Sequence, residues 1–117
     1  MPVIRIIRTV ALAGLVAMVL AMTYAWRNGD FVANATAIIG LPWGVVSLLD
    51  AYIGFALVGG WIVFRESQVV VGALWLASIL VVGNLATCIY VLIASFRAQG
   101  DLRRFWLGAR AEALRTS

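Results

Sequence analysis

With 117 residues, 64% of them hydrophobic, and a mean hydropathy of +1.03, the chain is too apolar for a soluble domain, which at this length buries only about 60–70% of its surface. The net charge of +4 comes from nine arginines that lie near the ends of apolar segments, which argues against nucleic acid as a partner. One cysteine excludes an intrachain disulfide, and the lack of histidine removes the usual ligand of haem and zinc.

Three apolar segments are long enough to cross a bilayer, which takes about 20 residues. They run from about residue 3 to 26, from 41 to 64 and from 69 to 96. We therefore predict an all-α membrane protein whose residues 1–97 form three transmembrane helices. Arg5 and Arg8 resemble the start of a signal peptide, but the apolar run that follows exceeds the usual length of about 7–15 residues. We expect a retained helix.

Small residues recur at every fourth position of the first segment, at Ala13, Ala17 and Ala21. Such a ladder lets helix backbones approach closely in a membrane. It predicts a packing face, directed at the other two helices or at another chain.

The stretch between the first two segments begins with a turn signal, Asn28-Gly29-Asp30. Residues 31–39 are expected to form a short helix at the membrane surface. Pro42 then opens the second helix, at a position where its missing N–H does no harm.

The second and third segments are joined by only four residues, Arg65 to Gln68, which predicts an antiparallel helical hairpin. A turn between Glu66 and Ser67 would place Asp50 level with Gly83 and Asn84. Arg65 and Glu66 are expected to form a surface ion pair of little energetic weight.

Asp50 is the most informative residue, because a carboxylate inside an apolar segment costs about 2.5–3.5 kcal/mol on insertion scales. Ser47 and Gly54 share its helix face, and Thr87 extends the polar stripe one turn beyond Asn84. Three interpretations are open: Asp50 and Asn84 hold the hairpin together, they form a proton or ion site, or they contact a partner subunit or ligand. Gly54 and Gly83 are predicted to allow close helix packing.

Residues 98–117 form a basic tail in which apolar residues recur at helical spacing. We predict an amphipathic helix on the membrane surface. A frayed tail and a segment that docks on a partner subunit are the alternatives. The expected interfacial anchors are Trp26, Trp43, Arg103, Arg104 and Trp106.

Three spans would put the two termini on opposite sides of the membrane. Arg5, Arg8 and Arg65 would then lie on one side, and Arg27 would share the other with Arg97 and the four arginines of the tail. The larger count predicts a cytoplasmic C-terminus in the inner membrane of a bacterium, although Arg5 and Arg8 favour the opposite orientation.

The second and third segments also resemble a family of small membrane proteins known only as a domain of unknown function. The resemblance covers about residues 3–96 and implies a three-helix membrane fold without an established activity. Asp50, Tyr52, Asn84 and Thr87 fall on its motif positions. The residues that carry it are Pro42-Trp43, Leu49-Asp50-x-Tyr52-x-Gly54-Phe55, Trp61, Arg65-Glu66 and Gly83-Asn84-x-Ala86-Thr87-Cys88-x-Tyr90-Val91.

No catalytic constellation, phosphate-binding loop or cluster of metal ligands is visible in the sequence. We therefore expect a non-enzymatic protein without a cofactor or metal. The leading hypothesis is an accessory subunit that packs on a larger membrane complex, for example a respiratory or photosynthetic one. The alternative is a homo-oligomeric transporter or channel that uses Asp50 and Asn84, and a third hypothesis is a lipid-binding or membrane-shaping role of the tail.

Overall fold

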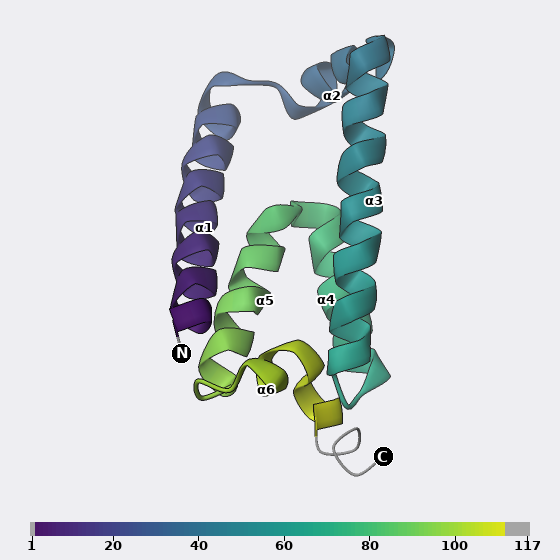
Figure 1. Cartoon of the computed structure of the whole chain (residues 1–117). Coiled ribbons are helices and arrows are strands. Elements are labelled where there is room, and N and C mark those ends of the chain that lie inside the picture. Colours follow the sequence, from purple (N-terminus) through teal and green to yellow (C-terminus); the bar gives the residue numbers. More distant parts are fainter. Residues whose placement is uncertain (1, 112–117) are drawn as a thin grey trace.

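The computed structural model describes residues 2–111, which form six α-helices and one short 3-10 helix and contain no strand. α1 and α3 are the two long uprights, α2 lies near one end of α3, and α6 lies at the opposite end of the molecule (Figure 1). We call these the α2 end and the α6 end. The elements are α1 (Pro2–Asn28), α2 (Phe31–Gly40), α3 (Pro42–Arg65), α4 (Val69–Val82), α5 (Asn84–Arg97), α6 (Leu102–Leu107) and η1 (Gly108–Arg110).

Two helices of the described residues, α1 and α3, are long and apolar enough to cross a membrane. α4 and α5 have 14 residues each. At 1.5 Å per residue each is about 21 Å long, which is short of the hydrocarbon thickness of about 30 Å. The all-α class is confirmed, but the prediction of three spanning helices is wrong.

The predicted third span, residues 69–96, is interrupted at Gly83. Its φ of +69° and ψ of −143° suit glycine and strain any residue with a Cβ. The Gly83 N–H donates to the Ile79 carbonyl at 2.8 Å and so closes the last turn of α4. α4 rises from the α6 end and α5 returns to it (Figure 1). A glycine followed by asparagine in a 28-residue apolar run was the available signal for this break.

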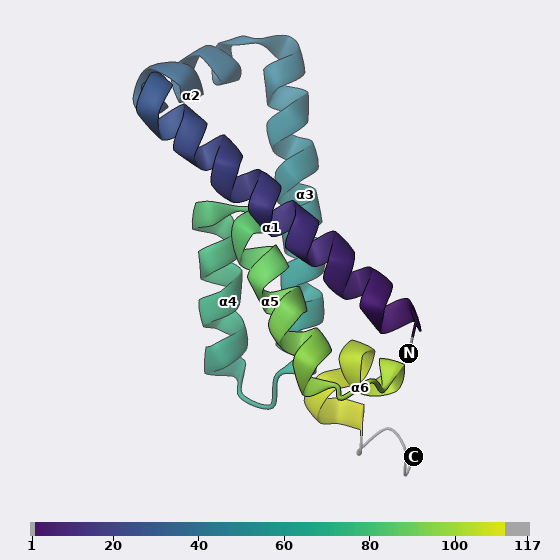
Figure 2. The same cartoon turned by 90° about the vertical axis from the view of Figure 1, so that its left-hand side faces the viewer.

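The interruption changes where α6 lies relative to the start of α1. The start of α1 and the whole of α6 lie at the same end of the molecule in both views (Figures 1 and 2). The prediction that the termini lie on opposite sides of the membrane depended on the third span and so loses its basis, and the side of the membrane on which each end lies stays a prediction. Of the arginines in this part of the chain, only Arg27 lies at the α2 end; the others are Arg5, Arg8, Arg65, Arg97, Arg103, Arg104 and Arg110.

At the α2 end, the helix boundaries agree with those predicted from the sequence. Asp30 caps α2, because its Oδ1 accepts from the N–H groups of Val32 and Ala33 at 3.1 and 3.3 Å. Pro42 lies in the first turn of α3. The predicted turn and short helix are confirmed, and no residue of α2 is buried.

The core lies at the α6 end. α3 packs along α4, and α1 crosses over α5 (Figure 2). A Cβ at Gly72 would lie 2.9 Å from the Cα of Val63, so this glycine lets the two backbones meet. The buried cluster consists of Ile4, Ile62, Ile79, Ala86, Tyr90, Ala94, Ala98 and Phe105.

The described part of the tail differs from the expected surface helix. Asp101 caps α6, whose six residues continue into η1. Phe105 is buried in the core, with only 2% of its surface exposed. The tail through residue 111 therefore folds back onto its own chain, and residues 112–117 of the predicted helix lie outside the described part.

Candidate functional site

Asp50 is exposed on α3, and its carboxylate has no hydrogen-bond or ion-pair partner within residues 2–111. Two contacts set the register of α3 against α4: Gly59 lies against Leu76, and Val63 lies against Gly72. Extended along the two antiparallel helices, this register places residue 52 of α3 opposite Gly83. Asp50 is thus only about 3 Å from the predicted depth. Asn84 is also exposed, however, and no hydrogen bond joins the two side chains.

The other members of the predicted polar stripe do not connect Asp50 to Asn84. The Ser47 hydroxyl donates to the Trp43 carbonyl of its own helix at 3.0 Å. The Thr87 hydroxyl oxygen is buried without a partner among the described residues. A Cβ at Gly54 would meet no atom within 4 Å, and one at Gly83 would lie 3.5 Å from Phe55 Cζ. These two glycines therefore are not the close-packing points that the sequence suggested.

The alanine ladder of α1 faces away from the rest of the chain. Ala13, Ala17 and Ala21 are exposed, whereas Ala11 is buried. A Cβ at Gly14 would lie 2.9 Å from Cys88 Sγ, which marks the face that packs on α5. The ladder is consequently unoccupied within the described chain.

The predicted anchors lie at both ends of the molecule. Trp26 and Trp43, at the α2 end, are 82% and 80% exposed. Trp106, Arg103 and Arg104 are exposed on α6. Their contact with a membrane surface stays a prediction.

The most elaborate polar structure was missed by sequence reasoning and centres on Arg65, the last residue of α3. Its side chain is buried, with 6% of the residue exposed. Arg65 Nε donates to the Phe105 carbonyl at 2.6 Å, Nη1 to the Tyr90 hydroxyl at 2.6 Å, and Nη2 to the Arg104 carbonyl at 3.3 Å. One guanidinium therefore ties α3 to α5 and to α6.

The expected ion pair of Arg65 with Glu66 is absent, since no carboxylate of the described residues lies within 4.0 Å of Arg65. Instead, the Tyr90 hydroxyl accepts from Arg65 and donates to Glu66 Oε1 at 2.7 Å. The hydroxyl is thus a neutral bridge between the two charges.

Aromatic rings surround this network. Trp61 lies edge-on to Tyr90, with ring centroids 6.0 Å apart, and its Nε1 donates to the Trp106 carbonyl at 2.9 Å. Trp75 also lies edge-on to Tyr90, with ring centroids 5.0 Å apart. Both tryptophans pack against the buried tyrosine.

A second arginine attaches α1 to α5. Arg8 Nε donates to the Ser95 hydroxyl at 3.2 Å, and Nη2 donates to the Ser95 carbonyl at 3.0 Å. The Arg8 guanidinium carbon lies 4.2 Å from the ring centroid of Phe96. Four arginines of the α6 end therefore make contacts that organise the fold, because Arg110 also donates to the Phe64 carbonyl and Arg103 to the Ala111 carbonyl.

The comparisons with known proteins give one match. The family model described as "Protein of unknown function (DUF1475)" covers residues 2–103. No curated protein and no solved structure matches the chain. The predicted resemblance to an uncharacterised family is confirmed, and the matched stretch extends beyond the predicted limit at residue 96 into α6. It contains Asp50 as well as Arg65, Glu66 and Tyr90, and it ends just before Arg104 and Phe105, whose carbonyls accept from Arg65.

Proposed function

The chain belongs to this family of proteins of unknown function, and from its own geometry we propose that it is a non-catalytic integral membrane protein. It acts as an accessory subunit that packs on a larger membrane protein. The observation that carries the proposal is the exposed Asp50, a carboxylate on an apolar helix without a partner within residues 2–111.

In the proposed arrangement α1 and α3 cross the bilayer, while the pair α4 and α5 enters it and returns. The α6 end faces the cytoplasm of a cell whose inner membrane holds the protein. The basic excess of this end supports that orientation, because short cytoplasmic segments carry most of the arginine of membrane proteins. Arg27 is the one arginine of the described residues at the opposite end.

The halves of α1 and α3 near the α2 end are the proposed binding surface. From residue 19 to 28 every residue of α1 is exposed, and Asp50 lies on the corresponding half of α3. The alanine ladder offers a second helix a close approach, and Asp50 requires a hydrogen-bond donor or a positive charge. A transmembrane helix of the partner that carries such a donor satisfies both requirements.

The test is gentle detergent extraction of the tagged protein, followed by mass spectrometry of the proteins that co-purify. A stoichiometric membrane partner that is retained by wild type and lost with Asp50→Leu supports the proposal. Ser78→Leu is the matched control, because Ser78 is exposed on α4 and its hydroxyl bonds only to the Leu74 carbonyl of its own helix.

The same two variants separate partner binding from stability. If Asp50 serves a partner, Asp50→Leu should raise the stability of the isolated protein while it abolishes co-purification, since the carboxylate then costs about 2.5–3.5 kcal/mol in lipid. Recovery of the chain only with copies of itself would instead favour the homo-oligomeric transporter or channel, in which Asp50 and Asn84 of different copies meet. A partner that survives Asp50→Leu argues against the proposed surface.

A further inference from the structure

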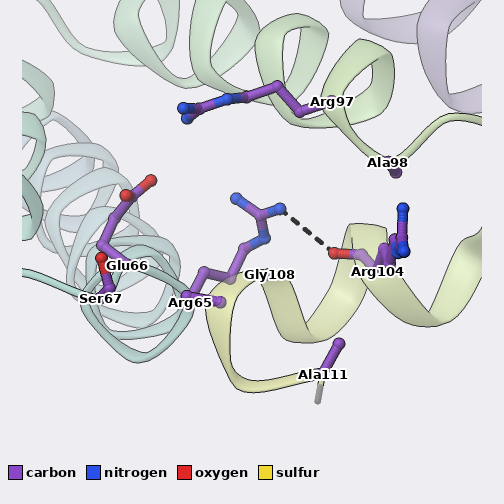
Figure 3. A pocket seen from close by; sticks show the side chains of 9 residues that line it. Arg65, Glu66, Ser67, Arg97, Ala98, Arg104, Gly108 and Ala111 are labelled. Carbon is purple, nitrogen blue, oxygen red and sulfur yellow. Dashed lines mark hydrogen bonds between the residues drawn. The ribbon is translucent and has the colours of Figure 1, made fainter.

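A cavity of about 370 Å³ opens at the α6 end, beside the Arg65 network. We propose that it binds a phosphate group, and this goes beyond the accessory role because the cavity lies at the other end of the molecule from Asp50. Figure 3 shows its lining, to which α3, α5 and α6 each contribute one arginine: Arg65, Arg97 and Arg104. Glu66 is the carboxylate among the described residues that line the cavity.

The buried Arg65 is the first argument for an anion. A charged side chain that is 94% removed from solvent is normally paired with an opposite charge. Among the described residues, all three acceptors of Arg65 are instead neutral, namely two backbone carbonyls and a hydroxyl. A guanidinium has five N–H groups, so two of them remain for a ligand.

The second argument is that the other two arginines are available. Arg97 has no side-chain hydrogen bond or ion pair with the described residues, and its guanidinium extends across the cavity from α5 (Figure 3). Within residues 2–111, the only ionic contact of Arg104 is Asp101 at 4.0 Å, and both side chains are half exposed. Such an exposed pair holds little energy, so Arg104 is free to bind a stronger anion.

The charge balance of the cavity fits one phosphate. In the lining that the structure describes, three guanidinium groups and the Glu66 carboxylate give a net charge of about +2, which balances inorganic phosphate and exceeds the single negative charge of a phospholipid phosphodiester. Glu66 is fixed by the hydrogen bond from Tyr90 at 2.7 Å, so one of its oxygens is already engaged. Arginine is suited to this ligand, because its planar fork donates two parallel hydrogen bonds to phosphate oxygens.

The position of the cavity leaves two sources of the phosphate. It lies where α3 and α5 end, which in the proposed membrane arrangement is the depth of the headgroups, so an anionic phospholipid can supply it. The cavity is also open to the aqueous side in that arrangement, so free phosphate can reach it. Both share one chemistry, and the experiment has one arm for each.

The lipid arm uses native mass spectrometry of the full-length protein extracted from vesicles of equal parts phosphatidylglycerol and phosphatidylcholine. We expect one retained phosphatidylglycerol, and about tenfold less retention for Arg97→Gln and for Arg104→Gln, since each removes a charge-assisted contact. Arg97→Lys should retain more phosphatidylglycerol than Arg97→Gln, because lysine keeps the positive charge. Arg5→Gln is the matched control: Arg5 is exposed at the same end, does not line the cavity, and its variant should stay within about twofold.

The free-anion arm uses the protein in nanodiscs of phosphatidylcholine alone, with inorganic phosphate replacing chloride at constant ionic strength. A rise of the thermal unfolding midpoint that disappears in Arg97→Gln and Arg104→Gln, but not in Arg5→Gln, assigns the site to free phosphate. Selective lipid retention with the same dependence assigns it to a headgroup. The proposal is overturned if neither ligand binds, or if Arg5→Gln reduces lipid retention or the phosphate-induced rise of the midpoint as much as the two cavity variants do. Arg97 and Arg104 are exposed, so their unliganded variants should unfold at the wild-type midpoint, which is the check that they fold.

Discussion

The two ends of the molecule hold their helices by different means. At the α6 end, glycines bring α3 and α4 together, the buried Arg65 attaches α3 to α5 and α6, and the half-buried Arg8 attaches α1 to α5. At the α2 end, α2 has no buried residue and the last ten residues of α1 are all exposed. The helices of the α6 end are packed against one another, whereas those of the α2 end are largely exposed.

This difference is instructive because lipid provides no hydrophobic drive for helices to associate. Helix association in lipid depends instead on close packing at small residues and on interhelical hydrogen bonds. At the α6 end, Gly72 is the small residue that allows close packing, and Arg65 makes the interhelical hydrogen bonds. The halves of α1 and α3 near the α2 end also carry small residues, in the alanine ladder, and a polar side chain, Asp50. Both are exposed and without a partner within the described chain. In the proposed role, the partner subunit uses them.

The largest expected effect concerns the sidedness of the two ends. In a Cys88→Ala background, Ser67→Cys and Ala109→Cys should react with an impermeant maleimide from one side of sealed vesicles, and Asn34→Cys from the other. The reason is that α4 and α5 return the chain to the α6 end (Figure 1). Near-complete labelling against background is expected for each position.

A continuous third span would place Ala109 on the side of Asn34. Labelling of Ala109→Cys together with Asn34→Cys would therefore overturn both the interrupted helix and the comparison of the two ends. The Cys88→Ala protein without an added cysteine serves as the background measurement, because the half-buried Cys88 is the one native cysteine.

The next effect concerns the buried charge. Arg65→Met leaves the carbonyls of Phe105 and Arg104 without their donor, and each unpaired buried acceptor costs about 1–3 kcal/mol. Loss of the desolvated charge offsets part of this, so we expect the free energy of unfolding to fall by about 2–4 kcal/mol. Denaturant titration in detergent measures it.

Arg27→Met is the control at the other end. Arg27 is exposed at the end of α1, and its replacement should change stability by less than about 0.5 kcal/mol. Equal losses in the two variants would show that the α6 end is not the stabilised half.

A smaller effect is expected at the tip of the α4–α5 pair. Gly83→Ala places a Cβ on a backbone with φ of +69°, and such strain costs about 1–3 kcal/mol. Gly60→Ala is the matched control, because a Cβ there meets no atom within 4 Å and alanine favours a helix by about 0.5–1 kcal/mol. Thermal unfolding of both variants decides: a Gly83→Ala protein as stable as Gly60→Ala would contradict the break.

The sequence was sufficient for the elements that depend on local chemistry. The cap at Asp30 and the start of α3 at Pro42 follow from side-chain preferences within a few residues. Apolar length alone, however, does not distinguish one long helix from two short ones. Gly83 decides between them through a positive φ, which composition does not reveal.

The candidate site was predictable only in part. The depth of Asp50 followed from the short link after Arg65, but the direction of its side chain depends on how α3 turns against α4. The Arg65 network joins residues 25 and 40 positions apart in the chain. Its Trp61, Glu66 and Tyr90 lay within the family motif, yet their roles required the return of α5 and α6 to the end of α3.

The smallest predicted effect tests the bridge in that network. Tyr90→Phe removes the hydroxyl between Arg65 and Glu66, and we expect the free energy of unfolding to fall by about 1–2 kcal/mol. The loss should be smaller than that of Arg65→Met, because the two backbone carbonyls keep their donor and the half-buried Glu66 can move toward the freed guanidinium. Tyr52→Phe is the control, since Tyr52 is exposed on α3, and it should change stability by less than about 0.5 kcal/mol. If denaturant titration shows equal changes for the two tyrosines, the hydroxyl bridge does not stabilise the α6 end, and its helices are held by packing and the arginine–carbonyl bonds alone.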